Sequence, residues 1–397
     1  MGLCDRPLDE GDTGRYLNRF ELQGTPMTNR MIHLLMLSLL ITFPVLAEAK
    51  TVKVFILSGQ SNMEGKGNPV HLDTYKSDPL IKPSYGSLKD GDSWKQRDDV
   101  WITYPSKSSG AKHGPLTVGY GTKGEDSIGP EFGFGHAVGD AIDEPVLLIK
   151  VAWGGKSIHK PFRPPNALPT DTELKQIAAD AKLKFESQMK NYEEKKKAGK
   201  KARKPKRAST FNELKMQFGE SYRKLIVHTK EELATFENKF PALKGYQPEI
   251  AGFIWHQGFN DKIRAEYRET KYADYTKWLA QFIRDVREDL SAPKMPFIIG
   301  ELSTGGIPSR GDFQTAQANT ATLPEFKDRV VFVPTAEYYD TKAHELYEKG
   351  FWKGTDEQKA QWQAVGNDRP YHYLGSGKTY YLKGRAFGDA VLKVITN

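Results

Sequence analysis

Five short apolar runs lie along the chain, and each gives way to glycine or small polar residues. Runs of this kind, rich in β-branched side chains and bounded by turn residues, are typical of buried strands. They show little alternation of apolar and polar positions, which indicates strands covered on both faces, as in a parallel sheet. The five runs are Val52–Leu57, Pro145–Ala152, Glu249–Trp255, Pro296–Ile299 and Val330–Pro334.

Helical patterns separate these predicted strands. A helix from Pro130 to about Ile142 begins with proline, which is favoured in the first turn of a helix. Apolar side chains recur at spacings of three and four in Tyr267–Glu288 and in Tyr380–Ile395, and a polar helix is predicted at Asp312–Leu323. The alternation of strands and helices predicts an α/β fold with a five-stranded parallel sheet covered on both faces.

Two stretches do not fit this alternation. Asp171–Lys197 and Phe211–Phe240 are rich in Lys and Glu, and they predict a helical hairpin laid on the main domain, as an insertion at about 166–245. The stretch Asn68–Gly129 is rich in Gly, Pro, Ser and Asp and is predicted to be a long loop. Loops of this length are usually functional, and its aromatic residues suit the faces of sugars. These aromatic residues are Trp94, Trp101 and Tyr104.

The amino-terminal residues have the pattern of a secretory signal. The short basic region Thr28–Met31 precedes the apolar run Ile32–Leu46 and a small-residue ending, which predicts a signal that starts at Met27 or Met31 and is cleaved near Ala49. The run is shorter than the ~20 residues needed to span a bilayer, so we expect no stable membrane insertion. Residues 1–49 are thus predicted to be a pre-sequence and residues 50–397 one domain, secreted or periplasmic. The only cysteine, Cys4, lies upstream of this signal.

The net charge of +8 is concentrated in one segment of the 397-residue chain. Residues 182–207 hold twelve Lys or Arg and three Glu, so the remainder is close to neutral. No aromatic residues are interleaved with the cations of Lys195–Lys204, as they usually are in a nucleic-acid-binding protein. We therefore expect no nucleic-acid partner. A solvated charge run is the simple interpretation, and contact with an anionic glycan or surface is the alternative.

A serine nucleophile is predicted where the first strand ends. Ser61 follows that strand directly, and the carboxyl ends of parallel strands share one edge of a sheet. A serine needs a base to take its proton, and the base needs a carboxylate to orient it. His372 is the best base, with Asp368 nearby, and His256 is second. Neither a phosphate loop nor a zinc-binding motif is complete, so no metal or cofactor is expected.

Taken together, the strand ends resemble the SGNH-type hydrolases, specifically the sialate O-acetylesterase-like carbohydrate esterases. The resemblance rests on Gly59-Gln60-Ser61-Asn62-Met63, Gly154-Gly155-Lys156-Ser157, Trp255-His256-Gln257-Gly258 and His372. It covers about Val52–Ser157 and Glu249–Val391, outside the hairpin. It implies a flavodoxin-like three-layer α/β/α sandwich that removes O-acetyl groups from carbohydrate without a metal.

The resemblance also implies roles for individual residues. Ser61 would be the nucleophile and His372 the base. The backbone N–H groups of Ser61 and Gly155, with the side-chain amide of Gln257 or Asn260, would stabilise the oxyanion. The neighbouring motif residues Gln60, Asn62 and Gly154 would contact the substrate.

Two positions depart from the family pattern. Phe259 stands where many relatives have glutamate, and Arg369 stands three residues before the histidine, where the acid is usual. The acid is then Asp368, or Asp340 after the fifth strand, or the enzyme works as a Ser–His dyad. Two other functions are alternatives to the esterase. The first is a non-catalytic glycan-binding module that uses the loop Asn68–Gly129, and the second is an adhesion or scaffold role for the basic hairpin. The sequence leaves the particular sugar and the oligomeric state open.

Overall fold

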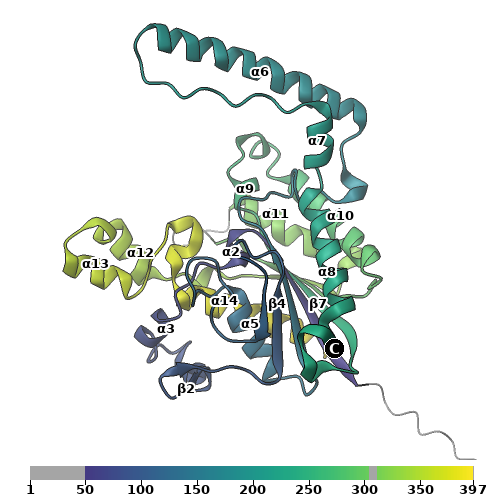
Figure 1. Ribbon diagram of the computed structural model, residues 1–397, viewed down its shortest axis with the longest axis vertical. Coiled ribbons are helices and arrows are strands. Elements are labelled where there is room, and N and C mark those ends of the chain that lie inside the picture. The colour runs from purple at the N-terminus through teal and green to yellow at the C-terminus, as the bar shows by residue number, and fades with distance from the viewer. Residues whose placement is uncertain (1–49, 304–310, 397) are drawn as a thin grey trace, which may run out of the picture. The chain divides into compact units, whose positions relative to one another are not determined.

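A seven-stranded sheet forms the centre of the computed structural model, which describes residues 50–303 and 311–396 (Figure 1). The strands follow the order β5-β4-β6-β1-β7-β8-β9, and every neighbouring pair is parallel except β4 and β5. The five predicted strands are all present. They are β1 (Thr51–Gly59), β6 (Val146–Ala152), β7 (Gln247–His256), β8 (Phe297–Gly300) and β9 (Val330–Val333).

The predicted count of five strands is wrong, because two further strands lie in the stretch expected to be a long loop. These are β4 (Val100–Tyr104) and β5 (Lys112–Pro115), at one edge of the sheet. The predicted sugar-facing aromatic residues therefore have other surroundings. Tyr104 is fully buried, Trp101 packs against the core, and Trp94 packs on the ring of Phe132. Tyr104 therefore cannot present its ring to a sugar, whereas Trp94 and Trp101 are only partly buried.

Helices cover both faces of the sheet and make the predicted three-layer α/β/α sandwich (Figure 1). In β1, Val52, Val54 and Ile56 enter one hydrophobic core, whereas Phe55 and Leu57 enter the other. This alternation buries both faces of the strand, as its unbroken apolar run predicted. One face packs on α8 (Glu220–Lys239), α10 (Ala273–Asp289) and α11 (Asp312–Ala321), and the other on α5 (Pro130–Gly139) and α14 (Gly377–Ile395).

The predicted helical hairpin is present only in part. Its first helix, α6 (Asp171–Lys197), has the expected bounds, but the second is divided into α7 (Phe211–Gln217) and α8 at Gly219, which has a φ of +72°. Only α8 packs on the sheet, through β6. α6 contacts α7 and buries a single side chain, Leu174, so it is not laid on the main domain.

Short elements complete the described chain. They comprise α2 (Ser61–Glu64), α3 (His71–Thr74), α4 (Lys82–Tyr85), the hairpin β2 (Lys89–Asp90) and β3 (Ser93–Trp94), α9 (Phe259–Lys262), α12 (Thr341–Glu348), α13 (Asp356–Gln363) and eight 3-10 turns. The described residues contain no helix that is both long and apolar enough to cross a membrane. The predicted signal segment lies outside them.

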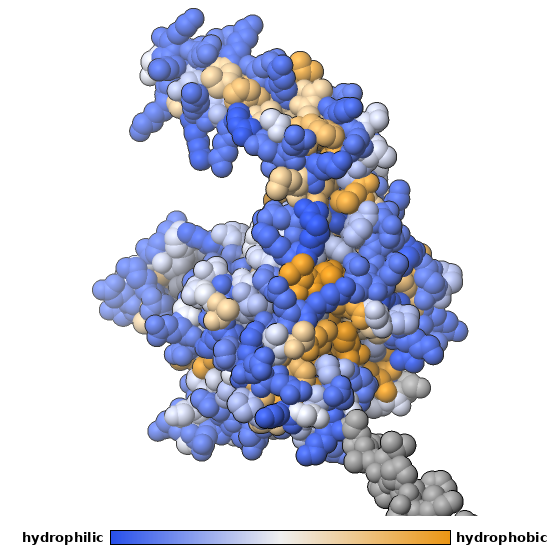
Figure 2. Space-filling view, turned by 45° about the vertical axis from the view of Figure 1, so that its right-hand side comes forward, coloured by the Kyte–Doolittle hydropathy of each residue, from blue (hydrophilic) through white to orange (hydrophobic). Residues whose placement is uncertain are grey.

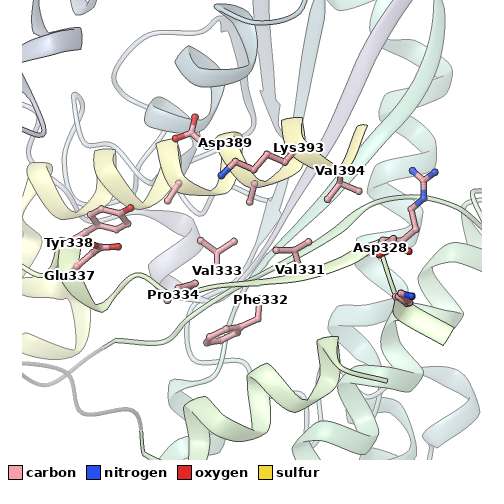
Figure 3. A pocket seen from close by; sticks show the side chains of 14 residues that line it. Asp328, Val331, Phe332, Val333, Pro334, Glu337, Tyr338, Asp389, Lys393 and Val394 are labelled. Atoms are coloured by element: carbon pink, nitrogen blue, oxygen red, sulfur yellow. The ribbon is translucent and has the colours of Figure 1, made fainter. Parts of the chain in front are cut away.

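A cavity of about 970 Å³ lies between the edge strand β9 and α14 (Figure 3). Val331 and Val333 point from β9 toward α14, and Phe332 points to the opposite face of the sheet. None of the predicted site residues lines this cavity. The candidate chemistry must therefore be sought at the carboxyl ends of the central strands.

Candidate active site

Ser61 occupies the first position of the one-turn helix α2, directly after β1. The strand ends at Gly59, where an added Cβ would lie 2.2 Å from the carbonyl oxygen of His256, so only glycine fits. The chain then turns at Gln60, and Ser61 is left partly exposed. The first N–H of a helix has no partner within the helix. Among the described residues, the Ser61 N–H has no hydrogen-bond acceptor.

The loop after β6 lies against Ser61. A Cβ added to Gly154 would lie 3.6 Å from the Cβ of Ser61, and the Gly154 N–H donates to Oε1 of Glu64 at 2.9 Å. Gly155 is exposed and has a φ of +72°, a conformation that favours glycine. The space around it is open, since an added Cβ would meet no atom within 4 Å. Glu64 therefore ties the Gly154–Gly155 loop to the turn that carries Ser61.

Gln60 and Gln257 join the loops after β1 and β7. Oε1 of Gln60 accepts from the Gly258 N–H at 3.1 Å and from Nε2 of Gln257 at 3.3 Å. Nε2 of Gln257 also donates to Oδ2 of Asp261 at 2.6 Å and to the Lys156 carbonyl at 3.1 Å. Both glutamines are buried. The N–H donors of Gln257 are therefore already used inside the protein.

Asp261 binds the backbone that follows the Gly154–Gly155 loop. Its carboxylate accepts from the backbone N–H groups of Ile158 and His159, each at 3.0 Å. Burial raises the pKa of Asp261 to about 6, against the hydrogen bonds that favour its charged form. Its neighbour Asn260 is partly exposed, and its side chain has no hydrogen-bond partner in the described parts of the chain. Asn260 is thus the amide of the two predicted donors that remains available.

His372 lies in a strained turn before α14. The three residues after it, Tyr373, Leu374 and Gly375, have φ values of 50°, 59° and 68°. For a residue other than glycine this left-handed conformation costs about 1–2 kcal/mol, and it persists where the surroundings impose it. The Tyr373 side chain is fully buried, and its hydroxyl lies 2.9 Å from Nε2 of His256. This buried contact fixes the turn and leaves the ring of His372 partly exposed.

Asn62 connects the serine turn to the histidine turn. Its Nδ2 donates to the Tyr371 carbonyl at 3.1 Å, and its Oδ1 accepts from the Tyr380 hydroxyl at 3.1 Å. Asn62 is fully buried, and both of its polar side-chain atoms bind protein groups. Because it follows Ser61 and Tyr371 precedes His372, these bonds bring the predicted nucleophile and base to the same edge of the sheet.

Asp368 lies beside His372, with Oδ2 3.3 Å from Nδ1 of the ring. Nδ1 of His372 is buried and has no hydrogen-bond partner among the described residues, so this contact is an electrostatic one. Lys123 approaches the same oxygen to 3.0 Å, and Oδ1 accepts from the Arg369 N–H at 2.7 Å. Partial burial opposes ionisation, but His372, the Arg369 N–H and Lys123 together hold the pKa of Asp368 well below its usual range. The carboxylate is therefore ionised at neutral pH.

The alternative acid and the alternative base are both engaged elsewhere. Asp340 caps α12 through the Ala343 N–H at 2.9 Å, and it accepts from the hydroxyls of Tyr75 and Ser376, each at 2.7 Å. His256 is fully buried between the Gly300 carbonyl and Tyr373. Its burial lowers its pKa well below the usual value. Neither residue is placed for the role that the sequence left open to it.

A buried ion pair supports the serine turn. Nζ of Lys150 in β6 donates to Oε2 of Glu131 at 2.7 Å, to the Glu64 carbonyl at 2.8 Å and to the Tyr120 carbonyl at 2.7 Å. Both charged side chains are fully buried. All three protons of the ammonium group are thus used, as a buried charge requires. The Glu64 bond fixes the last residue of α2.

Sequence reasoning missed the residues that hold the loops together, namely Glu64, Lys123, Lys150 and Asp261. Lys150 carried a usable signal, because a lone lysine inside an apolar strand requires a buried partner. Glu64 and Asp261 lie within the quoted motifs or beside them, but nothing in the sequence shows which loop a carboxylate turns toward. No group of three or more His, Cys, Asp or Glu side chains in the described residues is arranged to hold a metal.

The family is established by comparison with known proteins. A family model described as "Carbohydrate esterase, sialic acid-specific acetylesterase" matches residues 51–198 and 208–346, well over half of the chain. The protein is therefore a carboxylic ester hydrolase. It belongs to this family of carbohydrate esterases, which confirms the predicted resemblance. The match includes the inserted helices α6, α7 and α8, which the resemblance had left out, and it ends before Asp368 and His372.

Three solved structures show a more distant likeness. NanS shares 14% sequence identity with a TM-score of 0.47, over 87% of this chain and 98% of that one. A protein from Arabidopsis thaliana shares 16% identity with a TM-score of 0.43, over 86% and 98%. A carbohydrate acetylesterase from Xanthomonas citri shares 13% identity with a TM-score of 0.41, over 87% of this chain and 57% of that one. A search of curated protein sequences found no match.

Proposed function

We propose that the protein removes O-acetyl groups from carbohydrate by a serine esterase mechanism. The observation that carries this proposal is the pair of hydrogen bonds made by Asn62, which joins the Ser61 turn to the His372 turn within an established carbohydrate esterase. The predicted signal segment favours a glycan outside the cytoplasm as the substrate.

In this mechanism the oxygen of Ser61 attacks the acetyl carbonyl while His372 takes the serine proton. Asp368 stabilises the imidazolium that forms, and its low pKa keeps it charged for that purpose. The sugar hydroxyl then leaves with the proton from His372. Water attacks the acetyl-serine, again with His372 as the base, and releases acetate.

The negative charge on the tetrahedral intermediate needs donors that are already in place. The N–H groups of Ser61 and Gly155 and the side chain of Asn260 fit this role, because none of them has an acceptor within the described chain. Gln257 instead positions the loops, since Asp261 and Lys156 occupy its amide. Removing one such donor typically costs about 3–4 kcal/mol of transition-state stabilisation.

Hydrolysis of p-nitrophenyl acetate and acetate release from O-acetylated xylan and O-acetylated sialic acid test this proposal. We expect Ser61→Ala to abolish both activities, because no other group in the site can form the acetyl ester. Ser77→Ala, an exposed serine outside the site, is the matched control. Undiminished activity of Ser61→Ala would overturn the assignment. The preferred polymer then identifies the class of sugar.

A further inference from the structure

A groove of about 410 Å³ lies outside the esterase site, between the last turns of α6 and the segment that returns from it. Its lining includes amide, tyrosine and cationic side chains, which are Gln188, Asn191, Tyr192, Lys195, Lys201 and Arg203. Amides and a tyrosine ring are groups that bind sugar hydroxyls and sugar faces, and the cations bind anions. We call residues 188–207 the basic arm.

In the described chain, the cations of the basic arm that precede Arg207 have no acidic partners. Eight Lys and Arg side chains between 195 and 206 are exposed, and none forms an ion pair within residues 50–303 and 311–396. Glu193 and Glu194 precede them on α6, and Arg207 is the first cation with a partner, Glu213. Hydrophilic side chains dominate this part of the molecule (Figure 2). The arm therefore presents a concentrated positive potential to the solvent.

The arm has no structural duty that would explain this charge. α6 buries only Leu174, near its first turn, and its capping box at Thr170 and Glu173 also stabilises that end. Residues 199–207, which hold six of the cations, are the one interruption in the family match between 51 and 346. This charged segment thus lies outside the matched parts of the family model, and it follows the end of α6, where the helix buries no side chain.

We propose that the basic arm binds an anionic polysaccharide, such as a polyuronate, and holds the esterase on its substrate polymer. The choice of a polysaccharide rests on the proposed function of the esterase site. The arm has one aromatic residue in its groove, whereas binding of single-stranded nucleic acid relies on several stacked bases. Its cationic residues are not backed by the Trp, Phe or Leu face that a membrane-surface helix inserts.

Equilibrium binding of the full chain carrying Ser61→Ala tests this proposal, because this variant separates binding from hydrolysis. The probes are polygalacturonate, neutral dextran, a single-stranded oligonucleotide and vesicles of phosphatidylglycerol, at physiological salt. Lys195→Gln/Lys201→Gln/Arg203→Gln removes three groove cations. Lys184→Gln/Lys244→Gln/Lys342→Gln removes the same charge from exposed positions elsewhere. Tyr192→Ala tests the groove as distinct from charge alone.

We expect binding to polygalacturonate and none to dextran. Loss of the three groove cations should weaken it by about tenfold, Tyr192→Ala by several-fold, and the control substitutions by less than twofold, because only the groove cations contact the polymer. With Ser61 intact, the groove variant should hydrolyse p-nitrophenyl acetate like the unaltered protein. Four results would overturn the proposal. The first two are no binding to polygalacturonate, and an equal loss of binding in the groove variant and the control variant. The other two are unchanged binding by Tyr192→Ala, and tighter binding to the oligonucleotide or the vesicles than to polygalacturonate. Each outcome is independent of whether Ser61 is the nucleophile.

Discussion

Replacing Asp368 by asparagine removes the one carboxylate that lies within 4 Å of His372 in the described chain. At 3.3 Å, Coulomb's law with an effective dielectric constant of about 20 gives a ceiling of about 5 kcal/mol for the attraction to an imidazolium. The contact is longer than a charge-assisted hydrogen bond, and Lys123 shares the same oxygen. We therefore expect a loss of about 3 kcal/mol, which lowers kcat/KM by about 100- to 200-fold.

The assay is the steady-state hydrolysis of p-nitrophenyl acetate at neutral pH. The loss should lie in kcat, because in the proposed mechanism Asp368 stabilises the imidazolium of His372, which forms only in the transition state. Asp340→Asn is the matched control. It should lower the free energy of unfolding, because one amide oxygen cannot accept from both the Tyr75 and the Ser376 hydroxyl as the two carboxylate oxygens do, but it should change kcat by only a few-fold.

Either of two results would refute this reasoning. If Asp368→Asn stays within about threefold of the unaltered enzyme, the site works as a Ser–His dyad, because a threefold change is less than 1 kcal/mol. If Asp340→Asn instead loses activity a hundredfold while it remains folded, Asp340 is the acid. Circular dichroism and urea unfolding establish that each variant is folded.

Three further predictions concern the buried groups around the site. Glu64→Ala should lower kcat/KM by about tenfold, because the Gly154 N–H loses its acceptor. Glu64→Gln keeps an oxygen at that position and should stay within a few-fold of the unaltered enzyme. Equal losses of kcat/KM in the two variants would contradict this role of Glu64. Lys150→Met should lower the free energy of unfolding, measured in urea, by about 3–5 kcal/mol, because Glu131 is left buried and unpaired. Adding Glu131→Gln should restore part of the lost stability. No recovery in the double variant would count against the ion pair. Burial raises the pKa of Asp261 from 3.8 to about 6, so the folded state binds more protons than the unfolded state in that range. The free energy of unfolding should therefore fall as the pH rises from about 4 to 6, and Asp261 should account for at most about 3 kcal/mol of this fall. Asp261→Asn should lack this pH-dependent contribution. The same pH dependence in Asp261→Asn and the unaltered protein would refute the prediction.

The sequence predicted the buried part of the sheet and failed at its edge. The run Val52–Leu57 could be predicted to be a strand without knowledge of its neighbouring strands, because it is apolar on both faces. β5 consists of Lys112, His113, Gly114 and Pro115, which have little strand preference. It is a strand only because it pairs with β4, a tertiary contact that no local pattern encodes.

The same limit applies at the candidate site. A strand end followed by a small polar turn predicted where Ser61 lies, because sheet geometry determines that position. This pattern did not predict the directions in which the side chains of the residues next to Ser61 point. The expectation that Gln60 and Asn62 meet the substrate stays a prediction, and the motif did not reveal that their amides bind the loops after β7 and before α14. An amide can satisfy either a ligand or a backbone group, and only the fold determines which.

Covalent labelling of the nucleophile tests the central claim most directly. The full chain is incubated with diethyl p-nitrophenyl phosphate, digested, and analysed by peptide mass spectrometry. The account predicts one diethylphosphoryl group, on Ser61, formed in step with the loss of esterase activity and greatly slowed in His372→Ala. Complete inactivation with the label on another residue, or retained activity in a protein fully labelled at Ser61, would contradict it.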